Sequence, residues 1–214
     1  MPKIRVLLAD DHTVVRQGLR RILETDAEVE IVGEVGDGRA ALNAVRDLKP
    51  NVALLDISLP SLNGIEVTRQ IAKDVPETNV LILSMHADDA YIRQSLKAGA
   101  MGYLLKDADD QDLLKAITAV SAGSSYFSPR VSKVVRDGYL SDLGEPADDL
   151  AILSDREREV LQLVAEGKSN KEVAQILNLA VSTAESHRKH VMEKLDLHNT
   201  AEIVRFAVRK GIIQ

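Results

Sequence analysis

One short stretch of the chain constrains the fold more than any other. Four consecutive apolar residues, Val52 to Leu55, precede Asp56, and the turn-forming residues Pro60 and Gly64 follow. A short apolar run that ends at turn signals is typical of a strand buried on both faces, as in a parallel sheet. Ligands of such sheets bind at the carboxyl ends of the strands. Asp56 is therefore the first candidate for a functional side chain.

The same pattern recurs through the first part of the chain. Five strand-like segments are each followed by a segment with apolar residues at helical spacing. The predicted strands are 4–9, 29–35, 52–55, 80–84 and 102–105, and the predicted helices are 14–23, 38–48, 65–71, 92–98 and 113–120. This alternation predicts an α/β doubly wound fold, with a five-stranded parallel sheet and helices on both faces.

Composition limits what else the chain can be. Its 214 residues suit two domains, and the lack of cysteine excludes disulfides, zinc–thiolate sites and thiol chemistry. The apolar run at residues 6–9 is too short for a signal peptide or a membrane span, so we expect a cytoplasmic protein without a membrane partner. The net charge of −6 is uneven, with −7 before residue 151 and +1 after it, which favours the near-neutral remainder for any contact with nucleic acid.

Polar side chains stand at the ends of four predicted strands: Asp10 and Asp11, Asp56, Ser84, and Lys106. Because the carboxyl ends of parallel strands share one edge of the sheet, we expect these side chains to converge. Three carboxylates so close would repel one another unless a divalent cation joined them, and Mg²⁺ prefers such oxygen ligands. The lysine and the hydroxyl suit an incoming phosphoryl group. A single strand-end aspartate is more often a turn or helix cap, but the combination favours a site.

Over residues 3 to about 122, the sequence resembles the receiver domain of two-component response regulators, which has a flavodoxin-like fold. The resemblance rests on Asp10-Asp11, Asp56, Pro60, Gly64, Ser84 and Gly102-Tyr103-Leu104-Leu105-Lys106. It implies that Asp56 takes a phosphoryl group from a phosphohistidine of a sensor histidine kinase, assisted by Lys106 and Ser84. It also implies a Mg²⁺ site with four members: Asp10 (mostly through water), Asp11, Asp56 and the backbone carbonyl of Ser58.

The same resemblance assigns a switch pair. Ser84 looks like the residue that moves toward the phosphoryl oxygens, and Tyr103 like the one that then turns inward. Taken alone, Tyr103 is equally typical of a surface tyrosine, and its position three residues before Lys106 favours the switch role. His86 follows Ser84 by two residues, and both a role in dephosphorylation and a solvent-facing loop position stay open for it.

Residues 123–150 are predicted to link a first domain, 1–122, to a second, 151–214. Gly144, Pro146 and the acidic residues of 142–149 cannot pack a core, so we interpret this part as a flexible acidic segment. Residues 131–140 have the composition for one short helix.

The second domain is predicted to be all-α, with four short helices. Ser154 and Ser169 each precede a glutamate by three residues, which indicates capping boxes at the starts of two helices. A third helix is expected over 181–195, and a fourth opens at Asn199. A three-residue turn joins the second helix to the third, which is a helix-turn-helix pattern.

The third helix of this domain has two different faces. Its inward stripe is expected to comprise Val181, Ala184, Val191 and Leu195. The opposite face carries Ser182, Glu185, Ser186, Lys189 and Glu193, which are residue types that read base edges in the major groove. The alternative is a helix face that is merely solvated, and the domain context favours a face that contacts base edges.

Residues 151–214 resemble the LuxR-type DNA-binding domain, through residues 153–161, 167, 169–174, 183–188 and 192–195. Together, the two halves resemble a response regulator of the NarL/FixJ class, which implies a phosphorylation-dependent transcriptional regulator that binds double-stranded DNA. The resemblance implies base contacts from Glu185, Ser186 and Lys189. Its candidate phosphate contacts are Thr183, Arg188, His190, Lys194 and the backbone N–H of Asn170.

Two positions depart from the family pattern. Ala180 stands where a capping serine or threonine is usual, and Ser182 stands where a basic residue is frequent. Because affinity follows the number of phosphates neutralised, a monomer with few cations facing the DNA should bind weakly. We therefore expect phosphorylation to promote a homodimer on an inverted or direct repeat.

Two other functions compete with this one. A Mg²⁺-dependent phosphohydrolase would use Asp56 as its nucleophile, but position 58 is serine and not a second acid–base carboxylate. A phosphorylation-independent regulator would have a degenerate receiver, whereas the strand-end set is intact here. The expected protein is therefore not an enzyme in the usual sense, and its receiver site catalyses only its own phosphorylation and dephosphorylation.

Overall fold

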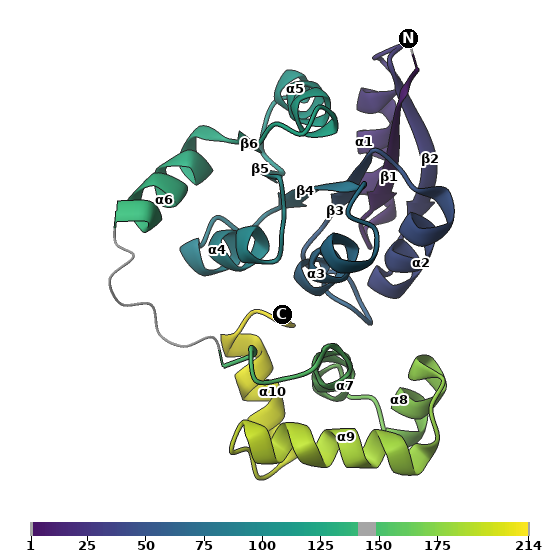
Figure 1. Cartoon of the computed structure of the whole chain (residues 1–214), viewed down its shortest axis with the longest axis vertical. Helices are drawn as coiled ribbons and strands as arrows, with labels where there is room; N and C mark the ends of the chain where they lie inside the picture. Colours follow the sequence, from purple (N-terminus) through teal and green to yellow (C-terminus); the bar gives the residue numbers. More distant parts are fainter. Residues whose placement is uncertain (1, 141–148, 214) are drawn as a thin grey trace. The chain divides into compact units, whose positions relative to one another are not determined.

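A parallel sheet forms the centre of the first half of the chain (Figure 1). The computed structural model describes residues 2–140 and 149–213, and the chain divides into two units next to Asp142. The strands are β1 (Ile4–Ala9), β2 (Val29–Val35), β3 (Val52–Leu55), β4 (Asn79–Ser84), β5 (Gly102–Leu105) and β6 (Tyr126–Phe127), in the order β2-β1-β3-β4-β5-β6. All neighbouring strands are parallel. The predicted doubly wound class is confirmed.

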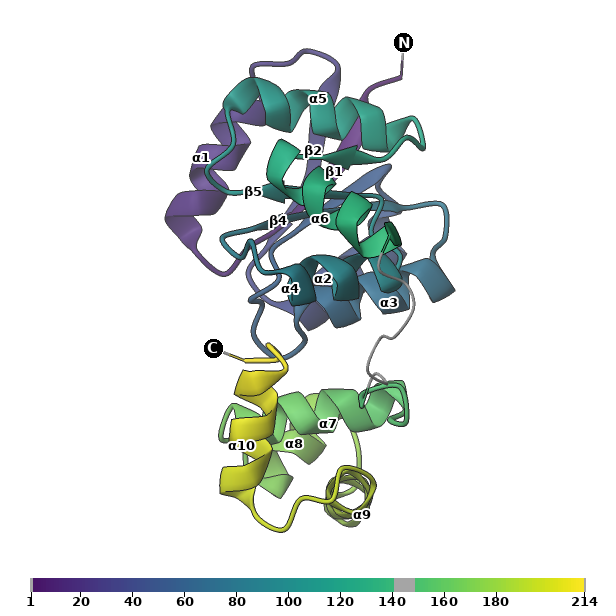
Figure 2. The same ribbon diagram turned by 90° about the vertical axis from the view of Figure 1, so that its left-hand side faces the viewer.

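Helices cover both faces of this sheet (Figure 2). One face carries α1 (Thr13–Leu23) and α5 (Asp110–Ser121), and the other carries α2 (Gly38–Leu48), α3 (Gly64–Asp74) and α4 (Asp89–Lys97). Because side chains alternate along a strand, the odd and even positions of β1 enter two different cores. Burial on both faces explains the apolar runs of the strands and leaves polar residues to the strand ends.

The first unit contains one strand more than the sequence predicts. The two residues of β6 pair with the outer edge of β5, where the Tyr126 N–H donates to the Met101 carbonyl over 3.3 Å. This pairing covers a row of backbone groups that would otherwise stand at an open sheet edge. The first unit therefore extends beyond residue 122, where the sequence places its end.

A helix after β6 also belongs to this unit. α6 (Pro129–Leu140) packs against α4, and Val131 is fully buried in the same core as Tyr103 and Ile92. The helix expected over 131–140 is therefore present, and its buried face joins it to the sheet domain.

Of the acidic segment expected over 142–149, only Asp149 lies within the described residues. Its Oδ2 lies 2.6 Å from Nζ of Lys210, so it is tied to the second unit. In the described part of the chain, no helix combines the length and the apolar character needed to cross a bilayer.

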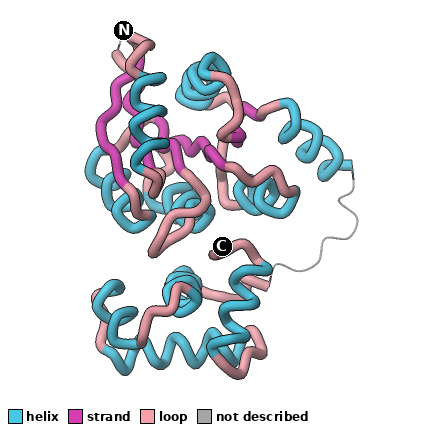
Figure 3. The backbone as a smooth tube through the Cα atoms, turned by 180° about the vertical axis from the view of Figure 1, so that it is seen from behind, coloured by secondary structure: helices cyan, strands magenta, loops and turns pink. Residues whose placement is uncertain are grey.

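In the described residues of the second unit, the chain forms four helices, and Figure 3 shows no strand there. They are α7 (Asp155–Ala165), α8 (Asn170–Leu177), α9 (Val181–Lys194) and α10 (Thr200–Arg209), and they enclose a core of their own in the described residues. The capping boxes predicted at Ser154 and Ser169 are both present. A short turn joins α8 to α9, and the predicted all-α helix-turn-helix domain is confirmed.

The inward stripe of α9 is shorter than predicted. Ala184 and Val191 are buried, but Val181 is 43% exposed, so its assignment to the stripe is wrong. Val181 is the first residue of the helix, and side chains on a helix lean toward its N-terminus. Its side chain therefore extends past the end of the core.

The start of α9 provides a first testable prediction. Ala180 occupies the N-cap position in an extended conformation (φ −67°, ψ 147°) and forms no side-chain cap hydrogen bond. Replacing Ala180 with serine should stabilise the domain by about 1 kcal/mol, because the new hydroxyl can accept a hydrogen bond from the first turn. Thermal unfolding measures this gain. Ser154→Ala is the reverse change, at an N-cap that already has its side-chain hydrogen bond, and it should destabilise the domain by a similar amount. An unchanged midpoint of thermal unfolding in Ala180→Ser would contradict the prediction.

Candidate functional site

Three of the predicted strand-end residues meet at the carboxyl edge of the sheet. Asp10 follows β1 and Asp56 follows β3, and both are buried, with 2% and 5% of their surface exposed. Lys106 follows β5, and its Nζ lies 2.6 Å from Asp10 Oδ2 and 2.8 Å from Asp56 Oδ2. The Asp56 N–H donates to the Ala9 carbonyl over 2.8 Å, which fixes β3 against β1 at this point. One ammonium group thus holds two buried carboxylates.

The charges of this group shift one another's protonation. Burial raises the pKa of the Asp56 carboxyl, the hydrogen bond from Lys106 opposes this, and the nearby charge of Asp10 adds to the rise. Burial lowers the pKa of Lys106, but its hydrogen bonds to the two carboxylates outweigh burial and raise that pKa overall. Two carboxylates with one ammonium leave an excess negative charge, which a further cation would neutralise.

The donor set fits a hard divalent cation. Ligand atoms of Asp10, Asp11, His12 and Asp56 all lie within 4.8 Å of one another. Three of the four are carboxylates, the ligands that Mg²⁺ prefers, and Asp11 is exposed, so water can complete the coordination. The residues present therefore fit the predicted Mg²⁺ site.

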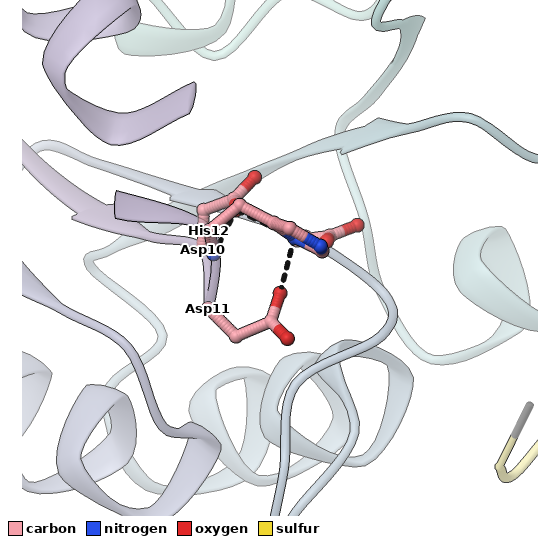
Figure 4. A group of neighbouring side chains, drawn as sticks. Asp10, Asp11 and His12 are labelled. Atoms are coloured by element: carbon pink, nitrogen blue, oxygen red, sulfur yellow. Dashed lines mark hydrogen bonds and ion pairs between the residues drawn. The ribbon is translucent and has the colours of Figure 1, made fainter. Parts of the chain in front are cut away.

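His12 is the member of this cluster that the sequence analysis did not name. The ring Nδ1 of His12 lies 2.7 Å from Asp11 Oδ1, an interaction drawn in Figure 4. The backbone N–H of His12 donates to Asp10 Oδ1 over 2.8 Å. It occupies the N-cap of α1. Its position directly after the two aspartates was the signal that could have identified it.

The predicted switch residues meet at the backbone of His86. Ser84 is fully buried, and its Oγ accepts a hydrogen bond from the His86 N–H over 3.0 Å. The Tyr103 hydroxyl donates to the His86 carbonyl over 2.7 Å. Tyr103 is fully buried, so the alternative of a surface tyrosine is wrong, and burial raises its pKa, which keeps the hydroxyl protonated.

His86 itself is half-buried and contacts two further elements. Its ring stacks on Tyr91 of α4 with ring centroids 4.4 Å apart, and its Nε2 lies 3.5 Å from the Ser58 Oγ. The solvent-facing position considered for His86 therefore does not describe its surroundings. One loop residue connects the ends of β3, β4 and β5 with the start of α4.

The candidate DNA-contacting residues fall into two groups. The first group is exposed along one side of α9: Thr183, Glu185, Ser186, Lys189 and His190. The second group forms hydrogen bonds within the domain and comprises Asn170, Arg188 and Lys194. These bonds were not apparent from the sequence, because each joins residues of different helices.

The bond of Lys194 leads to a prediction about pH. Its Nζ lies 2.7 Å from Oε2 of Glu157, a buried member of the α7 capping box. Burial raises the pKa of Glu157, but the hydrogen bonds from Lys194 and Ser154 outweigh it and hold the pKa below its usual 4.5. Because the folded-state pKa lies below the unfolded one, the stabilisation is present above about pH 4.5 and is lost as pH falls through the folded-state pKa.

Glu157→Gln should therefore lower the melting temperature of the second unit at pH 7, and the difference from wild type should shrink as the pH falls through the folded-state pKa of Glu157. Calorimetry of the full chain over this range measures it. Glu193→Gln, at an exposed glutamate of α9, is the matched control and should change the melting temperature little at any pH in this range. A difference that is the same at every pH would contradict the prediction.

Comparison with known families decides what these two units are. Residues 6–118 match the family described as "Response regulator receiver domain", and residues 151–207 match the one described as "Bacterial regulatory proteins, luxR family". The chain is a response regulator of the NarL/FixJ class. The receiver match spans the acidic edge of the sheet, and the second match spans the helix-turn-helix unit.

Relatives of this response regulator are similar over their whole length. The transcriptional regulatory protein MctR of Rhizobium johnstonii is 38% identical over 212 residues, which cover 99% of this chain and 96% of MctR. The oxygen regulatory protein NreC of Staphylococcus aureus is 38% identical over 216 residues, covering 99% of this chain and 100% of NreC. A structure of RcsB from Salmonella enterica serovar Typhimurium, bound to a promoter in the presence of the phosphomimetic BeF₃⁻, is 30% identical with a TM-score of 0.60 and covers 95% of this chain and 97% of RcsB.

The family establishes the general function. This response regulator is a DNA-binding transcriptional regulator, with a receiver domain followed by a LuxR-type domain. Its family comprises transcription regulators and not classical enzymes, and receiver domains bind Mg²⁺ at an acidic cluster such as the one formed by Asp10, Asp11 and Asp56.

Proposed function

We propose that Asp56 accepts a phosphoryl group from a phosphohistidine of a sensor histidine kinase, and that this modification strengthens DNA binding by the second domain. One observation carries the proposal: a buried carboxylate lies 2.8 Å from a lysine ammonium and beside two further aspartates. A carboxylate in this setting can act as a nucleophile, with positive charge in place for the incoming phosphoryl oxygens.

Each residue of the site has its own role in phosphoryl transfer. An Asp56 carboxylate oxygen forms the new bond to phosphorus, the P–N bond of the donor breaks, and the donor imidazole keeps the electron pair of that bond. Lys106 donates hydrogen bonds to the phosphoryl oxygens. Asp10 (mostly through water), Asp11, Asp56 and the Ser58 carbonyl would hold Mg²⁺, which when bound would neutralise charge on the phosphoryl oxygens. Hydrolysis of the resulting acyl phosphate returns Asp56 to its starting state.

The new group changes the hydrogen bonding of Ser84. An acyl phosphate brings negative charge and acceptor oxygens to the end of β3. The Ser84 hydroxyl turns toward these oxygens and away from the His86 N–H that it contacts at 3.0 Å. The His86 loop then loses one of its hydrogen bonds, and Tyr91 of α4, which stacks on the His86 ring, is coupled to this change. Tyr103 is buried in this structure, so the change begins at Ser84 and not at the tyrosine ring.

In the second domain, α9 enters the major groove. Glu185, Ser186 and Lys189 contact base edges, and Thr183 and His190 contact phosphates. Few cations stand on this face, so a single domain binds weakly and two copies on paired half-sites bind well. The promoter-bound RcsB structure, obtained with a phosphomimetic, supports a link between the receiver state and DNA binding.

The proposal is tested by incubating the full chain with acetyl phosphate and Mg²⁺ and measuring its intact mass. Wild type should gain one phosphoryl group and Asp56→Ala none, and light scattering should detect dimers of the phosphorylated form only. A wild type that gains no phosphoryl group would refute the proposal. Steady turnover of a small phosphoester would instead favour the phosphohydrolase alternative, and equal DNA binding with and without the modification would favour the phosphorylation-independent regulator.

A further inference from the structure

Arg188 projects from α9, but both arms of its guanidinium group contact other helices. Nη1 donates to Asn170 Oδ1 over 3.1 Å, and Nη2 donates to Thr200 Oγ1 over 2.7 Å. Asn170 is the first residue of α8 and Thr200 is the first residue of α10. Arg188 is half-buried, so its planar group is fixed between the starts of two helices.

These hydrogen bonds continue to a residue that we propose as a base reader. The Asn170 side chain accepts from Arg188 through Oδ1, and through Nδ2 it donates to Glu185 Oε1 over 3.5 Å. Glu185 lies one turn before Arg188 on α9, and its side chain is exposed. The carboxylate of Glu185 is therefore oriented by Asn170, and Asn170 is held in turn by Arg188.

We infer that Arg188 is a positioning residue for base recognition and not a phosphate contact. This inference rests on the proposed role of Glu185 in reading base edges. A carboxylate reads the amino group of cytosine only when it is held at the correct angle in the groove. Arg188 provides this by fixing α9 between α8 and α10 and by holding the amide that orients Glu185. The guanidinium places donors on two separate nitrogens, each facing one of the two acceptors, whereas all donors of a lysine ammonium share one nitrogen.

The two roles predict different dependences on salt and on sequence. Loss of a phosphate contact weakens binding to all DNA sequences alike and reduces the slope of log K against log salt concentration by about 1. Loss of a positioning residue reduces discrimination between sequences and leaves that slope unchanged, because no phosphate contact is removed.

The experiment uses the full chain, treated with acetyl phosphate and Mg²⁺, and a duplex that wild type selects from a random-sequence pool. Affinity for this duplex and for a scrambled duplex of equal length is measured over a range of salt concentrations. Arg188→Ala should lower the affinity ratio of the two duplexes by roughly 10-fold and leave the salt slope unchanged. Arg188→Lys keeps the charge but should not restore the ratio.

Two further variants separate positioning from charge and from folding. Thr200→Val removes one acceptor of Arg188 while keeping every charge, and it should lower the ratio in the same direction even if Arg188→Ala fails to fold. Arg205→Ala removes a charge from an exposed position of α10 and should leave the ratio unchanged.

A slope reduced by about 1 with an unchanged ratio in Arg188→Ala would overturn the inference, as would full recovery in Arg188→Lys or an unchanged ratio in Thr200→Val. If wild type itself does not distinguish the two duplexes, the base-reading role of α9 fails, and the inference fails with it. If wild type distinguishes the two duplexes and Arg188→Ala has the same affinity ratio, the inference about Arg188 is refuted, while the base-reading role of α9 stands.

Discussion

Replacing Lys106 with methionine is expected to slow phosphorylation by acetyl phosphate by about 100-fold. The Lys106 ammonium lies 2.8 Å from Asp56 Oδ2, where it stabilises the charge of the phosphoryl group during transfer. Methionine keeps the unbranched apolar stem of the side chain and removes the terminal ammonium, with its charge and its hydrogen bonds. The rate is measured by following the intact mass of the full chain over time.

The same substitution should destabilise the receiver domain by about 3 kcal/mol when Mg²⁺ is chelated, because it leaves two buried carboxylates without their counter-charge. Adding Mg²⁺ should restore part of this loss, since the cation neutralises the same carboxylates. Lys115→Met is the control, at a lysine of α5 whose side chain is 63% exposed, and it should change neither rate nor stability appreciably. A phosphorylation rate for Lys106→Met within a few-fold of wild type would show that this lysine does not act in the transfer.

Replacing Gly64 with alanine is expected to damage both the fold and the site. A Cβ built at Gly64 would lie 2.1 Å from the backbone oxygen of Asp56 and 3.1 Å from the Cα of Ile57. These neighbours are backbone atoms that cannot rotate away, so either the start of α3 or Asp56 must shift. We expect a loss of stability of about 3 kcal/mol. We also expect phosphorylation slower by 10-fold or more, because a displacement of about 1 Å at a reacting group is costly.

Gly18→Ala is the matched control for this change. Gly18 lies within α1, and a Cβ there would meet nothing within 4 Å. Alanine should stabilise the helix at that position by about 1 kcal/mol, because glycine is the poorer helix former. Thermal unfolding and the rate of phosphorylation measure both variants. Normal stability and rate in Gly64→Ala would mean that the loop between β3 and α3 relaxes without moving Asp56.

The core of the receiver domain could be predicted because several local signals agree there. The apolar run at 52–55 specifies a strand buried on both faces, and parallel strands then bring their ends to one edge. That rule places Asp10, Asp56 and Lys106 together without any knowledge of the distances between them. The roles of these residues in phosphorylation and metal binding stay predictions until the experiments above are done.

Other features had no local signal. β6 has only two residues and no periodicity to detect, and its pairing depends on the free edge of β5. α6 shows helical spacing, but nothing in its sequence specifies that Val131 packs beside Tyr103. Such contacts depend on the path of the chain between elements, which sequence patterns describe poorly.

The second domain shows the same division. Capping boxes at Ser154 and Ser169 mark helix starts from the sequence alone, because each motif is local. Val181 was misassigned because helical spacing specifies a face but not where the core ends. Arg188 was named as a candidate phosphate contact from the resemblance to the LuxR-type domain, whereas its bonds to Asn170 and Thr200 depend on how three helices pack.

The central claim is that the phosphorylation state of Asp56 determines how tightly the second domain binds DNA. The most direct measurement is the affinity of the full chain for the selected duplex, before and after treatment with acetyl phosphate and Mg²⁺, in wild type and in Asp56→Ala. We predict that treatment tightens binding by wild type at least about 10-fold, with formation of a dimer, and leaves Asp56→Ala unchanged. Equal affinities for treated and untreated wild type, at full phosphorylation by mass, would contradict the account.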